Sequence, residues 1–180
     1  MGHKAVKAAL VTKLAAGLPG WTDMNVWVAR GGALPADAKR WPFVLVRTTR
    51  MTSVKYVSNT VMICTYRCEV TCGVRSPSGD RDASLDDATE RRDDLIEAVR
   101  WVLRADRGLG PDMRITNAEM VEDTAEAVLE GSGPAIAMGT TTFVVSSTET
   151  IPAATGSDPA ESVGVIDLAV SGVDAAQPLP

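Results

Sequence analysis

The sequence is poor in the residues that carry most enzyme chemistry. Its 180 residues include a single histidine, His3, and three cysteines, Cys64, Cys68 and Cys72. A Ser–His or Cys–His nucleophile needs a histidine that other residues can surround, and the first residues of a chain usually fray. The sequence also contains neither Gly-x-x-x-x-Gly-Lys nor a Gly-x-Gly-x-x-Gly after a strand. We therefore expect no enzyme activity, no catalytic residue and no cofactor.

Long apolar runs and an excess of basic residues are also missing. No run approaches the ~18 apolar residues of a membrane-spanning helix. Lys7 and Lys13 interrupt the weakly apolar stretch from Met1 to Gly20, so the sequence predicts neither a membrane span nor a secretory signal. The formal net charge is −5, whereas a general nucleic-acid binder is usually strongly basic.

The charge is nevertheless distributed unevenly along the chain. Residues 1–78 hold 11 Lys and Arg against 3 Asp and Glu, whereas residues 111–180 hold 1 against 11. Opposite ends of such a chain attract each other, either within one subunit or between neighbours.

The three cysteines lie in a segment with the pattern of a strand. Apolar and polar residues alternate from Met62 to Val74, which is the period of a half-buried strand. Residues four apart on a strand are roughly 13 Å apart, too far for a disulfide or a shared metal. An odd cysteine count without a secretory signal also favours reduced thiols. We expect Cys64, Cys68 and Cys72 to be reduced and buried on a strand from about Thr60 to Arg75.

A long amphipathic helix is predicted to begin near Ser84 and to stop at Gly108. At about 100° per residue its apolar positions share one arc, and its last turns are basic, as the helix dipole favours. The apolar positions are Ala88, Leu95, Val99, Val102 and Leu103.

The remaining elements are shorter. The pattern predicts a helix over Lys4–Leu18, strands over Met24–Ala29, Pro42–Arg50, Met113–Val121 and Ala135–Ser147, and a loop over 51–59. Ala118–Leu129 is open to a helical alternative. We expect an α+β fold with a mainly antiparallel sheet, on which one short N-terminal helix and one long amphipathic helix pack. Residues 1–149 form this domain, and 150–180 are a Pro/Ala/Gly-rich extension.

Two groups of carboxylates are candidate functional sites. Asp80 to Asp86 places oxygens at alternate positions of a calcium loop, but Leu85 stands where the loop needs glycine and Arg91 where it needs a bidentate glutamate. A helix N-terminus explains the same residues without metal. Asp93 and Asp94 lie on the polar stripe of the helix, which favours a solvated face over acid–base chemistry. We expect no metal site.

Residues 4–148 resemble the tail terminator proteins of long-tailed, siphovirus-type bacteriophages. The resemblance lies in the order of elements, the Trp41-Pro42-Phe43-Val44-Leu45-Val46 strand entry, the single long helix and the late Thr140–Val145 strand. It implies a subunit of a ring, typically a hexamer, that caps the tail tube and meets the head connector or stopper protein. DNA passes through the lumen without being read. The protein would then lie at the head–tail junction of the virion, and in the host cytoplasm during assembly.

Trp101 is the residue that the sequence points to as a subunit contact. It falls roughly 140° from the centre of the apolar arc, beside Asp94 and Glu97. An exposed tryptophan among acids suits a basic patch on a neighbour. The candidate basic residues are Arg30, Arg40, Arg47 and Arg50. Alternatively, Gly31–Lys39 or the C-terminal extension folds over Trp101 within one subunit.

The extension is expected to be a docking arm. Its composition cannot build a core, but it contains Val163, Val165, Ile166, Leu168 and Val170, which could add a strand to the sheet edge of a neighbour. A solvated tail is the alternative. Two other functions also stay open, namely another phage head–tail joining or minor capsid component, and a small ligand-binding module.

Overall fold

The computed structural model describes residues 2–31, 35, 40–76, 81–116, 121–129 and 135–151. For residues 49, 81–83 and 121–129 it describes the backbone only. The helices are α1 (His3–Gly17), the short 3-10 helix η1 (Leu18–Gly20) and α2 (Arg81–Ala105). The strands are β1 (Trp27–Arg30), β2 (Phe43–Tyr56), β3 (Val61–Arg75), β4 (Gly108–Gly110), β5 (Met113–Ile115), β6 (Val121–Leu129) and β7 (Ala135–Thr150).

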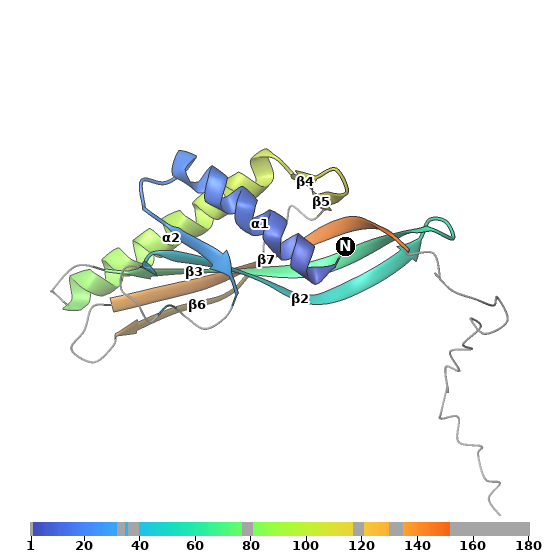
Figure 1. Cartoon of the computed structure of the whole chain (residues 1–180). Helices are drawn as coiled ribbons and strands as arrows, with labels where there is room; N and C mark the ends of the chain where they lie inside the picture. Colours follow the sequence, from blue (N-terminus) through green and yellow to red (C-terminus); the bar gives the residue numbers. More distant parts are fainter. Residues whose placement is uncertain are drawn as a thin grey trace, which may run out of the picture.

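The strands form one sheet with β3 and β7 at its centre. The order is β1-β2-β3-β7-β5-β4, and β6 pairs with β7 beside β5. The β1–β2 pair is parallel, and all the other described pairs are antiparallel. β2 and β3 form a long hairpin that projects at one end of the molecule, where β7 also ends (Figure 1).

Both helices lie on the same face of the sheet (Figure 1). α1 contributes Val6, Leu10 and Leu14 to the core, and its last residue, Gly17, lies directly against Val102 of α2. α2 packs on β7 and β3. The core lies between this helix layer and the strand residues that face it, with Cys68, Cys72 and Phe143 among its fully buried members.

This architecture confirms the α+β class and the mainly antiparallel sheet. The strand over the cysteines runs from Val61 to Arg75, and all three thiols are free and buried. The five apolar positions predicted for the long helix are also buried, with exposures from 0% to 5%.

Three boundary predictions are wrong. Residues 51–56, predicted as a loop, continue β2, because pairing with the outer half of β3 satisfies their backbone groups even though their side chains face water. α2 ends at Ala105 rather than at Gly108, which begins β4. The strand predicted over Met113–Val121 ends at Ile115.

The alternative of a helix over Ala118–Leu129 is also wrong over residues 121–129. These residues form β6, because they pair antiparallel with β7 from Thr142 to Ala135. The predicted Val163–Val170 strand, Asp80 and most of the Gly31–Lys39 loop lie outside the described residues.

Candidate functional site

Two tryptophans stack on each other at the surface of the helix layer. The ring centroids of Trp21 and Trp101 are 5.4 Å apart, and the ring planes differ by 5°. Trp21 directly follows η1, and Trp101 lies on the last turns of α2. Both remain far from buried, with 49% of Trp21 and 45% of Trp101 exposed. Half-exposed stacked tryptophans offer apolar and π surface to a partner.

Acidic side chains line the Trp21 side of this pair, whereas Arg92, Arg100 and Arg104 line an adjoining groove on the other side of Trp101. A groove of about 390 Å³ is lined by Trp21, Thr22, Asp23, Met24, Asp94, Glu97, Ala98 and Trp101. No lysine or arginine of the described chain lines it. The indole N–H of Trp101 donates a long hydrogen bond of 3.4 Å to Oε1 of Glu97. We call this surface the acidic tryptophan groove.

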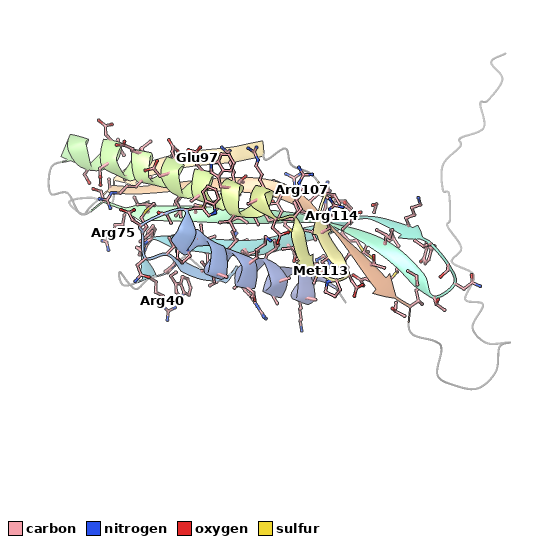
Figure 2. The ribbon with its side chains drawn as sticks, turned by 90° about the horizontal axis from the view of Figure 1, so that it is seen from above. Arg40, Arg75, Glu97, Arg107, Met113 and Arg114 are labelled. Atoms are coloured by element: carbon pink, nitrogen blue, oxygen red, sulfur yellow. The ribbon has the colours of Figure 1, made fainter. Side chains whose placement is uncertain are left out.

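The periodicity of α2 positions the groove. Asp94, Glu97 and Trp101 are spaced by three and four residues, so they share one stripe of the helix. Leu95 and Val99 face the other way and are fully buried against the sheet. Because the core holds that apolar stripe, the helix cannot rotate the tryptophan inward without exposing the leucine. Figure 2 looks down on the helix layer, with Glu97 on α2 in front of the sheet.

The opposite face of the sheet is rich in basic residues. Side chains alternate between the two faces of a strand, and the buried cysteines mark the helix side of β3. The register of the strands then assigns the other side chains to a face. On the face away from the helices, β2, β3, β5 and β7 carry Arg47, Arg50, Lys55, Arg67, Arg75, Arg114 and a single acid, Glu69. We call this the basic sheet face.

The predicted contact residues therefore divide between two surfaces. Trp101, Asp94 and Glu97 come together in the groove, whereas Arg47 and Arg50 are exposed on the basic sheet face. Arg40 lies elsewhere, with its guanidinium 5.0 Å from the ring centroid of Trp27.

Trp21 is the aromatic groove residue that the sequence did not single out. It follows Pro19-Gly20 in a segment with no periodicity of its own. Its place against α2 depends on how α1 packs on α2, with Gly17 against Val102. The only feature of the sequence that could have pointed to Trp21 is its position directly after the Pro19-Gly20 helix stop.

Charged hydrogen bonds fix both ends of α2. Near its start, the hydroxyl of Ser76 donates to Asp87 at 2.6 Å and Arg91 donates to the other oxygen at 2.9 Å. These bonds lower the pKa of Asp87, the Ser76 bond most. Beyond its end, the ammonium of Lys13 lies 2.7 Å from the carboxylate of Asp106, and this bond, with one from the Gly108 N–H, lowers the pKa of Asp106.

Three titratable side chains of β3 have raised pKa values. Burial raises the pKa of Cys68 and that of Cys72 to about 12, which disfavours the reactive thiolate. The hydroxyl of Tyr66 donates to Glu149 at 2.6 Å, and burial followed by that carboxylate raises the pKa of Tyr66. His3 packs edge-on against Tyr66, with ring centroids 4.9 Å apart.

Within the described part of the chain, no three His, Cys, Asp or Glu side chains gather as metal ligands. Asp80 and the side chains of residues 81–83, part of the calcium-like segment, fall outside what the structure describes. None of the helices in the described ranges combines the length and apolar character that crossing a membrane requires.

Comparison with known proteins gives no assignment. No known family model matches the chain, and no curated protein is significantly similar to it.

Proposed function

We propose that the protein is a structural virion component that assembles into a hexameric ring, caps the tail tube and joins the tail to the head connector. The observation that carries the proposal is the opposite charge of two surfaces on opposite sides of one sheet. The acidic tryptophan groove lies on the helix layer, and the basic sheet face lies behind it.

A ring needs two different complementary patches on each subunit. In a heterologous, head-to-tail contact, one patch of a copy meets another patch of the next copy, and the chain closes if the rotation allows it. In the proposed ring, the groove of one copy meets Arg47 and Arg50 of its neighbour. Guanidinium groups stack on tryptophan faces and pair with carboxylates, so Trp101, Asp94 and Glu97 suit such a partner.

In the proposed ring, the packing of the helices on the sheet leaves the contact surface of α2 exposed. The short α1 and the long amphipathic α2 pack on the sheet with their apolar stripes, which leaves the polar stripe of α2 and Trp101 for the neighbour. The contact therefore costs little reordering, because the groove exists before the neighbour arrives.

The partners follow from the same role. The ring would contact the tail tube protein on one side and the head connector or stopper protein on the other. DNA would pass through its lumen without sequence-specific contacts. Trp101, Asp94, Glu97, Arg47 and Arg50 are contact residues in this proposal, and none of them is catalytic.

Native mass spectrometry of the purified full chain tests the ring. A closed hexamer that forms with rising concentration supports the proposal. A monomer that stays monomeric and carries a small molecule favours the ligand-binding module instead.

Electron microscopy of tail tubes tests the place of the ring. Tubes mixed with the protein should carry one ring at an end and stop growing there. A ring that leaves tube ends bare, yet binds the head connector, favours another head–tail joining component.

A further inference from the structure

Within the described part of the chain, the β2–β3 hairpin has an uncovered strand edge. β1 pairs with β2 only at Phe43–Val46, although β2 continues to Tyr56. Among the strands that the structure describes, none pairs with residues 47–56 on the side away from β3. The backbone N–H and C=O groups along such an edge form a template for a further strand.

The same hairpin exposes an unusual set of apolar side chains. Met51 is 46% exposed, Val54 38%, Tyr56 70% and Val57 59%. The charged residues of 47–60 are all basic, namely Arg47, Arg50 and Lys55. An edge with apolar and basic side chains suits a strand that is apolar and acidic.

The C-terminal extension has that composition and begins at the hairpin. Residues 152–180 contain four acids and no Lys or Arg, with an apolar segment at Val163–Val170. The described fold ends at Ile151, whose N–H donates to the carbonyl of Thr60 at 2.8 Å. Thr60 lies in the turn of the β2–β3 hairpin, beside the end of β7 (Figure 1).

We propose that Val163–Val170 of a neighbouring copy adds as a strand to the β2 edge between Arg47 and Tyr56. The proposal rests on the ring assembly above, because it needs a neighbour. It uses the backbone edge of the hairpin, whereas the groove contact uses the side chains of Arg47 and Arg50 on its face. One hairpin can therefore serve both contacts.

The alternation of side chains matches between the two strands. Val54 and Tyr56 point to the helix side, and Lys55 points to the basic sheet face. In the extension, Ile166, Leu168 and Val170 would share one face of a strand, and Asp167 would lie on the other with Val163 and Val165. Added to the edge of β2, the extension would place its apolar side chains beside Val54 and Tyr56, and Asp167 near the basic residues.

Chain length permits a neighbour as the donor, and the proposed ring places a neighbour within reach. The extension leaves from β7, which β3 separates from the free edge of β2. Residues 152–162 can span up to about 36 Å when extended, and the prolines at 152 and 159 favour extended backbone before them. This reach allows the segment to cross to the next subunit of a ring.

Site-specific photo-crosslinking tests the proposal on the full chain. A photoreactive phenylalanine analogue replaces Tyr56 in an unlabelled copy, which is mixed with wild-type chain labelled with ¹⁵N. After irradiation, mass spectrometry should find crosslinks from position 56 to Val163–Val170 that join unlabelled to labelled peptides. The same analogue at Glu90, which is exposed on α2, should give no crosslinks to that segment.

A shortened chain gives a second measurement. Ending the chain at Ile151 should raise the concentration at which rings form by about tenfold or more, because each copy loses one tethered contact. Crosslinks within one copy, crosslinks to another segment, or an unchanged assembly concentration would overturn the proposal. A ring without the crosslinks refutes only the added strand, whereas a full chain that never assembles refutes the ring itself.

Discussion

Trp101 stacks on Trp21, a residue 80 positions earlier in the chain, with 5.4 Å between ring centroids and 5° between ring planes. The sequence left open whether a loop of the same subunit covers Trp101. The stacking partner is the residue after η1, and 45% of Trp101 is exposed. The two candidate covers, Gly31–Lys39 and the C-terminal extension, lie mostly outside the described residues. In the proposed ring, these two parallel rings beside Asp94 and Glu97 receive the guanidinium groups of the neighbouring copy.

The first prediction concerns Trp101→Ala. The substitution should weaken ring formation while the helical signal changes little, because Trp101 contributes surface to the groove rather than to the core. Val99→Ala, two positions earlier on α2, is the matched control, since Val99 is fully buried in the core. It should cost roughly 1–3 kcal/mol of unfolding free energy and leave assembly of the folded protein intact. Thermal melts and native mass spectrometry measure the two effects. If Trp101→Ala unfolds the subunit instead, the tryptophan belongs to the core.

The second prediction concerns the thiols. Cys64, Cys68 and Cys72 should resist a thiol reagent in the native protein and react once it is denatured, because all three are buried. Cys68→Asp should cost several kcal/mol, since it buries an unpaired carboxylate, whereas Cys68→Ala should cost ~1 kcal/mol. Rapid native labelling of all three would show that β3 does not face a closed core.

The third prediction concerns pH. The Ser76 hydrogen bond and Arg91 lower the pKa of Asp87 below its ordinary 3.8. A lowered pKa stabilises the fold above the pKa of the unfolded state, and this stability is lost as the pH falls through the lower, folded value. Ser76→Ala should therefore reduce the unfolding free energy more at pH 7 than below pH ~3. Urea melts at the two pH values test this, and an equal loss at both would contradict it.

The fourth prediction concerns Gly73. A Cβ on Gly73 would overlap the ring of Phe43, which is fully buried. Gly73→Ala should cost about 1–3 kcal/mol, because the ring must leave its place. Gly20→Ala is the control, since its Cβ would meet nothing within 4 Å. Equal melting temperatures for the two variants would show that the Phe43 site can relax.

The sequence predicted secondary structure and burial best where one hydrophobic period continues over many residues. The alternation across Cys64–Cys72 and the helical spacing from Ala88 to Leu103 each determine a buried face by themselves. Residues 51–56 gave no such signal, because water surrounds their side chains and their strand exists only through pairing with β3. β6 depends in the same way on β7.

The candidate site was predictable in its residues but not in its arrangement. Helical spacing alone places Trp101 with Asp94 and Glu97. The face of β2 on which Arg50 lies depends on the register shift after Thr48, and a shift of one residue moves every later side chain to the other face. Neither this register shift nor the packing of Trp21 against α2 can be predicted from local sequence patterns.

The central claim is that the acidic tryptophan groove of one copy binds the basic sheet face of the next. Two charge-reversed variants test it. One carries Asp94→Lys and Glu97→Lys, and the other carries Arg47→Glu and Arg50→Glu. In either variant alone, the two surfaces that meet between neighbouring copies carry the same charge. Each variant should therefore stay unassembled at concentrations where the wild type forms rings.

Native mass spectrometry of an equimolar mixture of the two variants is the most direct measurement. Each variant then offers the other a complementary surface, so the account predicts rings with an even number of copies in which the variants alternate. Circular dichroism of each variant establishes that it is folded. Folded variants that assemble singly as well as the wild type, or a mixture that stays unassembled, would contradict the account.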